Sequence, residues 1–194
     1  MRWIIKNWAR VGGVLSLLLI AGLFLRWERW WEQAGALLWL HLALLMLHQF
    51  EEYVYPGGFK AFFNQDIYGK RGPFRYPLTD GAILAVNIVL GWGFYALAAL
   101  AGPGALAFGA GLVLVSGLNG LVHSLLFVAK RKYNPGFLTG LLLFLPFALY
   151  FFYQTRDELS NSDWSTALTI GLLGTGMIPM MIFLTGRQQE GANS

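Results

Sequence analysis

Five polar residues of this chain have the types and the helical spacing that catalysis or metal binding requires. His48, Glu51 and Glu52 form a His-x-x-Glu-Glu segment, and Asn119 and His123 form an Asn-x-x-x-His segment. Residues three or four apart lie on the same face of a helix. Each segment therefore predicts a polar face on an otherwise apolar helix.

The residue types in these two segments indicate a divalent metal site. Imidazole and carboxylate groups together suit Zn²⁺, Fe²⁺ or Mn²⁺, and helix bundles hold such ions with Glu and His from facing helices. We expect His48, His123 and one glutamate to be the metal ligands, and we take Glu52 for this position, although the sequence does not distinguish it from Glu51. With water at an open position, Glu51, Glu52 and Asn119 would be catalytic, the glutamates through protons and the amide by polarising a carbonyl or oxyanion.

The composition predicts that these residues are positioned by membrane helices. Charged residues make up 12% of the 194 residues, about half of the roughly 25% usual in a soluble domain. Apolar runs of about 17–25 residues are long enough to cross a bilayer. Six windows contain no Asp, Glu, Lys or Arg: 11–25, 34–50, 81–101, 105–129, 137–153 and 165–184. We therefore expect an all-α bundle of six transmembrane helices in a single domain, residues 1–194, and exclude a soluble domain, a disordered chain and a nucleic-acid-binding protein.

Basic residues predict the orientation of the six spans. Both termini and the loops 51–80 and 130–136 lie on one side, which holds 11 of the 14 Lys and Arg residues, against three on the other side. The positive-inside rule then places both termini in the cytoplasm and the protein in the cell membrane. The net charge of +4 is explained in this way without an anionic partner, and the absence of cysteine excludes thiolate sites and disulfides.

The first span and the 51–80 loop differ from the other segments. The first span is short and is bounded by Arg10 and Arg26; no small-x-small site follows it, so we expect a retained helix rather than a cleaved signal peptide. The 51–80 loop is rich in Gly, Pro and aromatic residues, which argues against a long regular helix. A loop of this length is often functional, and we expect it to act as a lid.

The polar residues are predicted to lie at one depth. His123 precedes Lys130 by seven residues, which places it about 10 Å from the cytoplasmic interface at the helical rise. His48 and Asn87 reach a similar level from the same side. An alternative is that single polar residues such as His41 and Asn87 only fasten helices together. The two glutamates would then be solvated caps at a helix end.

A third segment, Tyr133-Asn134-Pro135-Gly136, completes a recognisable set of motifs. In this order the three segments resemble the HXXEE-domain family of integral membrane proteins, which is marked by H-x-x-E-E, N-x-x-x-H and Y-x-P-G motifs. The resemblance covers residues 40–150 approximately. It implies that the five polar residues form one site, and it supplies no substrate because the family is functionally uncharacterised.

Three functions are compatible with these residues. The first is a metal-dependent hydrolase surrounded by membrane lipids, which acts on a lipid or a membrane-embedded peptide. The second is a proton- or ion-coupled transporter, in which His41 continues a route outward from His48. The third is a non-catalytic structural protein. A separation above about 8 Å between the imidazoles of His48 and His123 would exclude a shared metal, given Zn–N distances near 2.1 Å.

Overall fold

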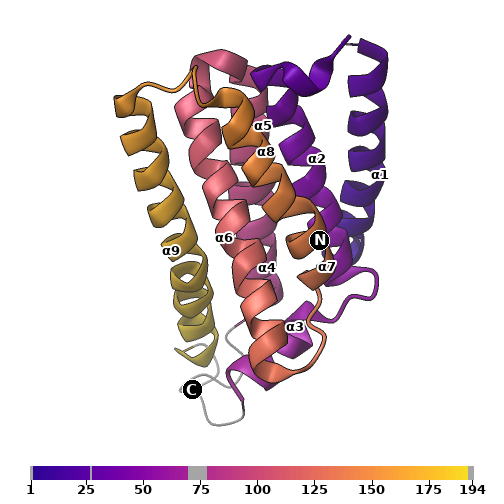
Figure 1. Ribbon diagram of the computed structural model, residues 1–194. Helices are drawn as coiled ribbons and strands as arrows, with labels where there is room; N and C mark the ends of the chain where they lie inside the picture. Colours follow the sequence, from indigo (N-terminus) through magenta and orange to yellow (C-terminus); the bar gives the residue numbers. More distant parts are fainter. Residues whose placement is uncertain (1, 27, 70–77, 192–194) are drawn as a thin grey trace.

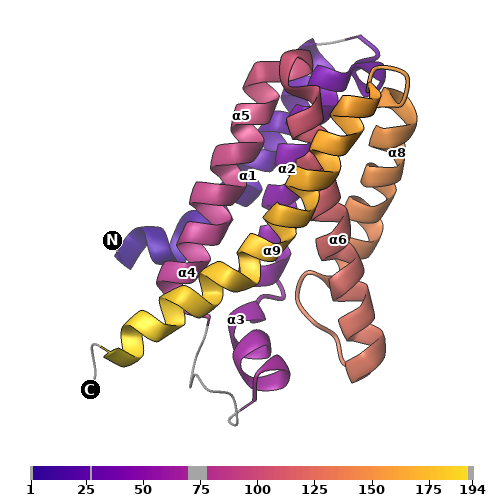
Figure 2. The same cartoon turned by 90° about the vertical axis from the view of Figure 1, so that its left-hand side faces the viewer.

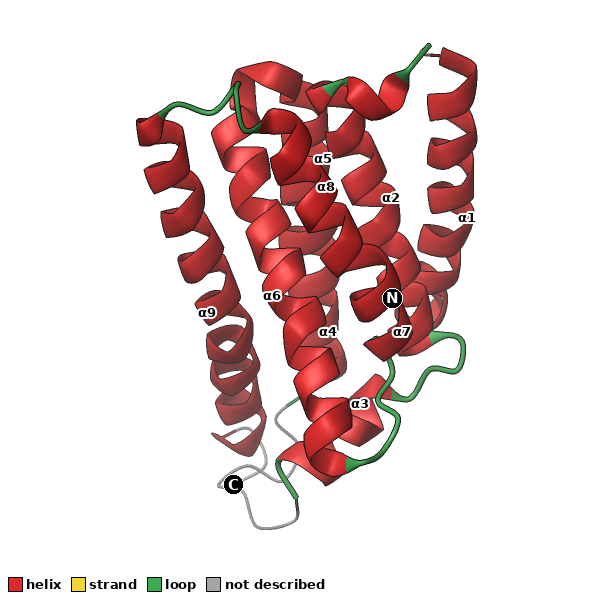
Figure 3. Ribbon diagram, in the orientation of Figure 1, coloured by secondary structure: helices red, strands yellow, loops and turns green. Residues whose placement is uncertain are grey.

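The computed structural model describes residues 2–26, 28–69 and 78–191, and every element in these ranges is helical (Figures 1 and 3). The elements in chain order are α1 (Arg2–Arg26), η1 (Trp30–Glu32), α2 (Ala34–Tyr53), α3 (Phe59–Phe62), η2 (Phe63–Ile67), α4 (Asp80–Leu84), η3 (Ala85–Trp92), α5 (Gly93–Ala101), η4 (Gly102–Ala105), α6 (Leu106–Lys130), α7 (Phe137–Thr139), η5 (Gly140–Phe144), α8 (Leu145–Thr155) and α9 (Asn161–Gly191).

Among the described residues, five helical runs are long and apolar enough to cross a membrane, and one of them is long enough to cross twice. They are Trp3–Arg26, Ala34–Tyr53, Asp80–Lys130, Phe137–Thr155 and Asn161–Leu184. The third run has 51 residues and reverses at η4, where Gly102 has a φ of 58°. The half before this turn comprises α4, η3 and α5, and α6 leads back from the turn (Figure 2). The chain is thus an all-helical membrane bundle with six crossings, as predicted.

Helix α2 is the central element, and α1 packs against it. A Cβ on Gly13 would lie 2.6 Å from the ring of Phe50, and one on Gly12 would lie 2.8 Å from Trp92. Small residues let helices in a membrane approach closely, and these two glycines allow α1 to do so. These close contacts place α1 against α2 and η3.

The described part of the 51–80 loop contains only short helices, as its composition predicts. These helices, α3 and η2, lie below the bundle in Figure 1, while the predicted turn and aromatic residues between 70 and 77 lie outside the described residues. An ion pair of 2.8 Å joins Asp66 to Lys132 beyond α6, and one of 2.6 Å joins Lys60 to Asp80. These contacts hold the short helices against the ends of α4 and α6.

Helix α6 and the π-helical segment η5 make the closest helix contact near the polar residues. A Cβ on Gly120 would lie 2.7 Å from the carbonyl oxygen of Gly140. The glycine inside the Asn-x-x-x-His segment thus brings the start of the fifth span against α6. This approach places Thr139, the last residue of α7, beside α2.

Candidate metal centre

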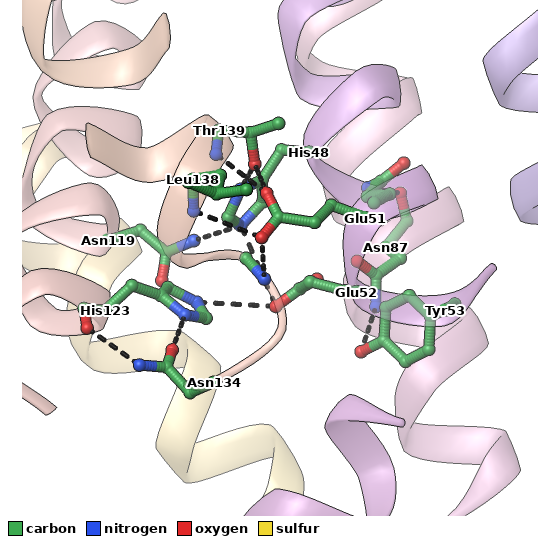
Figure 4. A network of polar contacts seen from close by, with 12 residues as sticks. His48, Glu51, Glu52, Tyr53, Asn87, Asn119, His123, Asn134, Leu138 and Thr139 are labelled. Carbon is green, nitrogen blue, oxygen red and sulfur yellow. Dashed lines mark hydrogen bonds and ion pairs between the residues drawn. The ribbon is translucent and has the colours of Figure 1, made fainter. Parts of the chain in front are cut away.

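Two imidazoles and one carboxylate converge between α2 and α6 (Figure 4). Oε1 of Glu52 lies 3.7 Å from Nε2 of His48 and 3.4 Å from Nε2 of His123. The ring centroids of the two histidines are 5.1 Å apart, well inside the limit for a shared metal. One potential ligand atom of each residue lies within 4.8 Å of the other two. All three side chains are buried, so the alternative of a solvated cap does not hold for Glu52.

The hydrogen bonds of Asn134 determine which nitrogen of His123 carries a proton. Nδ2 of Asn134 donates to the backbone oxygen of His123 at 3.0 Å, which orients the amide because a carbonyl only accepts. Oδ1 of Asn134 therefore faces Nδ1 of His123 at 2.6 Å. An amide oxygen also only accepts, so Nδ1 is the donor. In the neutral imidazole, Nε2 then has a free lone pair.

Thr139 determines the tautomer of His48 in the same way. Its hydroxyl donates its one proton to Oε2 of Glu51 at 2.5 Å. Nδ1 of His48 lies 2.8 Å from the same hydroxyl oxygen and must be the donor. Nε2 of the neutral His48 is thus unprotonated. This agrees with its position 3.1 Å from Nδ2 of Asn119, which is a hydrogen-bond donor.

With both imidazoles neutral, these assignments direct three electron-rich atoms toward one another, and Nε2 of His48 also accepts from Asn119. All three residues are buried, where the charge of Glu52 and the lone pair of Nε2 of His123 are costly. A cation among them would remove this cost. Metal-binding histidines typically donate the second ring nitrogen to an oxygen acceptor, as His48 and His123 do here. The residues therefore fit a metal with a two-histidine, one-carboxylate ligand set.

Glu51 is also buried, but its carboxylate faces a different set of groups. Five donors from the segment between α6 and η5 surround it: Tyr133 Oη at 2.5 Å, Gly136 N at 2.9 Å, Leu138 N at 3.1 Å, Thr139 N at 2.7 Å and Thr139 Oγ1 at 2.5 Å. The backbone donors belong to the start of a helix, where N–H groups lack partners within the helix. Glu51 thus holds the Y-x-P-G segment in place against α2.

Gly136 brings this segment against both imidazoles. Its φ of 99° lies in the left-handed region, and a Cβ there would lie 2.6 Å from Cε1 of His123 and 2.9 Å from Cε1 of His48. Any other residue would be strained and would also displace the rings. The glycine of the third motif is therefore part of the wall of the candidate metal centre.

The centre opens on a cavity of about 480 Å³ between α2, the η3–α5 region, α6 and α9. His48, Glu52, Asn119 and His123 all line it, and so does Asn87. Asn87 also donates to Tyr53 Oη at 3.4 Å and to the oxygen of Ile83 at 2.9 Å, so it links η3 to α2. His48, Asn119, His123 and Asn87 thus line one cavity, from α2, η3 and α6.

Two residues of the centre had no functional prediction. Asn134 is the variable position of Y-x-P-G, and Thr139 is one hydroxyl residue at the start of a span, with no local pattern to distinguish it. His41, in contrast, lies apart from the centre, where its Nε2 is 2.9 Å from Oγ of Ser116. It belongs to a separate polar contact between α2 and α6.

A family model described as "protein of unknown function with HXXEE motif" matches residues 39–151. The match covers more than half of the chain and includes every residue of the centre, so the chain belongs to the HXXEE family, as its motifs predict. No curated protein and no solved structure matches the chain.

Proposed function

We propose that the protein is a metal-dependent hydrolase of the cytoplasmic membrane, with His48, Glu52 and His123 as the metal ligands. The observation that carries the proposal is the set of fixed tautomers, which directs two unprotonated imidazole nitrogens and one carboxylate oxygen at the same point. Two histidines and a glutamate are a known ligand set of catalytic zinc, and Fe²⁺ and Mn²⁺ also accept these groups.

A bound metal would supply Lewis-acid polarisation of a substrate carbonyl. The other steps belong to the chain. Glu52 makes both of its imidazole contacts through Oε1, which leaves Oε2 to take a proton from water as the water oxygen bonds to the carbonyl carbon. The same proton then passes to the leaving oxygen as the ester C–O bond breaks. The amide of Asn119 lines the cavity and would donate to the carbonyl oxygen.

We assign Glu51 a positioning role in place of the proton-transfer role expected for it. Its five hydrogen bonds use the carboxylate fully, and one of them comes from the hydroxyl that orients His48. It acts on the reaction through Thr139 and Gly136. Replacing Glu51 by Gln would turn one acceptor into a donor that faces other donors, at a cost of about 1–3 kcal/mol for the groups left unsatisfied.

Metal content tests the ligand set. We expect about one equivalent of Zn, Fe or Mn in the purified protein and its loss in His48→Ala and His123→Ala. His41→Ala is the matched control, because His41 is equally buried on α2 but contacts Ser116 and not the centre. Wild-type protein without metal, or equal loss in His41→Ala, would contradict the proposal.

Chelation tests the reaction. In vesicles that contain the protein, we expect release of fatty acid that stops when a chelator is added and returns with the metal. Glu52→Gln removes a proposed metal ligand as well as the proton acceptor, so it should lower the rate by at least about 10²–10⁴-fold, the usual contribution of a general base. Unchanged hydrolysis after complete metal removal would exclude the proposed chemistry.

A proton relay is the second candidate, and the contacts of His41 favour it. His41 lies 2.9 Å from the hydroxyl of Ser116, which in turn lies 2.7 Å from the hydroxyl of Tyr95. Ser116 is farther than His123 from the cytoplasmic end of α6. A relay would use Glu52 and the two central histidines as proton acceptors. It predicts proton flux across vesicles that His41→Ala abolishes, whereas the hydrolase should tolerate this change.

A further inference from the structure

We propose that the cavity beside the metal centre holds one hydrocarbon chain of a lipid, so that the substrate is an acyl lipid rather than a peptide. This inference rests on the proposed hydrolase function and specifies its substrate class. The cavity volume of about 480 Å³ lies within the range of roughly 300–1,000 Å³ that is usual for sites that enclose a small molecule.

The cavity is elongated along the bundle. Its wall on α6 runs from Leu112 to Leu126, about 21 Å at the helical rise, and His123 lies near the cytoplasmic end of this stretch. From the level of His123 to Leu112, about 16 Å of cavity extends into the membrane interior. Apolar side chains dominate this upper part: Leu45, Leu90, Phe94, Leu112, Val115 and Phe144. A chain inserted there would end with its carbonyl near Asn119 and Glu52.

The polar groups of the upper cavity are already paired. Ser116 contacts His41 at 2.9 Å and Tyr95 at 2.7 Å. Gln49 accepts from Nε1 of Trp92 at 2.6 Å and donates to the backbone oxygen of Asn87 at 3.2 Å. An extended peptide would bring backbone N–H and C=O groups that need partners in an apolar site. A hydrocarbon chain needs none, so the lining favours an acyl chain.

One wall of the cavity can be filled without touching the centre. Thr175 on α9 lines the cavity, and its hydroxyl only donates to the oxygen of Gly171, four residues earlier in the same helix. Thr169 makes the same bond to Ser165 but is exposed on the outer face of α9. Thr175→Trp and Thr169→Trp thus make the same change inside and outside the cavity.

A second pair lies on η3, another wall of the cavity. Leu90 lines the cavity, whereas its neighbour Val89 is 66% exposed. Leu90→Trp and Val89→Trp therefore repeat the test from η3. Metal content serves as a check of folding in all four variants, because none of these residues belongs to the proposed metal centre.

The probe is a long-chain fatty acid with a diazirine near its terminal methyl group, cross-linked by light to the purified protein. We expect labelled peptides from α5 and the first half of α6, and labelling reduced at least about tenfold, equivalent to 1.4 kcal/mol, in Thr175→Trp and Leu90→Trp. Thr169→Trp and Val89→Trp should label like the wild type. Oleate should displace the probe.

Absence of labelling in the wild type, or equal labelling in both members of each pair, would overturn the inference. Displacement by an apolar peptide but not by oleate would also overturn it, in favour of a peptide substrate. His123→Ala separates the two proposals, because it should lose metal and still bind the probe. Metal without probe binding would refute only the acyl-chain site, and probe binding without metal would refute only the metal-dependent function.

Discussion

Thr139 is the residue on which the orientation of His48 depends. Its hydroxyl accepts from Nδ1 of His48 and donates to Glu51, so it connects the metal centre to the carboxylate that positions the Y-x-P-G segment. Thr139→Val keeps the shape of the side chain but removes this acceptor. We expect metal affinity to fall about 10–100-fold, the usual effect of losing a group that orients a ligand. Competition with a chelator of known affinity measures it.

Thr139→Ser is the matched variant, because it restores the hydroxyl without the methyl group. It should recover most of the metal affinity. If Thr139→Val binds metal as tightly as the wild type, the tautomer of His48 does not depend on this contact. Thr139 would then not be what keeps Nε2 of His48 unprotonated.

Tyr133 connects the stability of the centre to pH. Burial, and then its hydrogen bond to Glu51 and the charge of that carboxylate, raise the pKa of the Tyr133 phenol above its ordinary value of about 10. The folded protein therefore keeps the phenolic proton at a pH where the unfolded chain loses it. Stability from this group is complete below about pH 10 and is lost as pH rises through the folded pKa.

Tyr133→Phe should thus cost about 1 kcal/mol at neutral pH, because a half-exposed hydrogen bond to a carboxylate is lost. The difference from the wild type should shrink above about pH 10. Thermal unfolding in detergent at both pH values measures this. Tyr55→Phe is the control, since Tyr55 is 76% exposed. A difference that grows with pH would show that the phenol does not hold its proton as proposed.

At the scale of elements, the contact between α6 and η5 positions the fifth span. Gly120→Ala would place a methyl group 2.7 Å from the oxygen of Gly140, and backbone cannot move aside as a side chain can. We expect a loss of about 1–3 kcal/mol from overpacking, together with weaker metal binding because Thr139 moves away from His48. Thermal unfolding and metal content report the two effects.

Gly22→Ala on α1 is the matched control, because a Cβ there meets no atom within 4 Å. In a helix this change should be neutral or stabilising by about 0.5–1 kcal/mol. Equal destabilisation in the two variants would mean that the α6–η5 contact has no special role.

The sequence predicts the two polar faces of the site but not the contact between α6 and η5. Helical periodicity places His48 near Glu52 and Asn119 near His123, so both polar faces follow from spacing alone. The role of Thr139 depends on how the chain returns after α6, which is set by Gly136, Gly120 and the five donors to Glu51. The donors to Glu51 lie about 85 residues from it in the chain, and Gly120 meets Gly140 across the turn after α6, so no local pattern encodes these tertiary contacts. For the same reason the sequence could not distinguish Glu51 from Glu52.

At the scale of the whole molecule, the charge distribution and the position of the centre are connected. The proposed metal ligands lie in the half of α2 and α6 that ends at the loops rich in Lys and Arg, so orientation decides which side of the membrane would supply water and receive products. If basic loops face the cytoplasm, as we propose, the centre is reached from the cytoplasmic leaflet.

Single cysteines test this orientation, because the chain contains none. Gly104→Cys lies in the exposed turn η4, where a Cβ meets no atom within 4 Å, and Tyr55→Cys lies exposed at the opposite end. Neither change alters the charge that determines topology. In intact cells an impermeant maleimide should label Gly104→Cys, and Tyr55→Cys should react only after the membrane is permeabilised. Labelling of Tyr55→Cys from outside would reverse the topology. The metal centre would then face the outer leaflet, and its lipid substrate and water would come from that side.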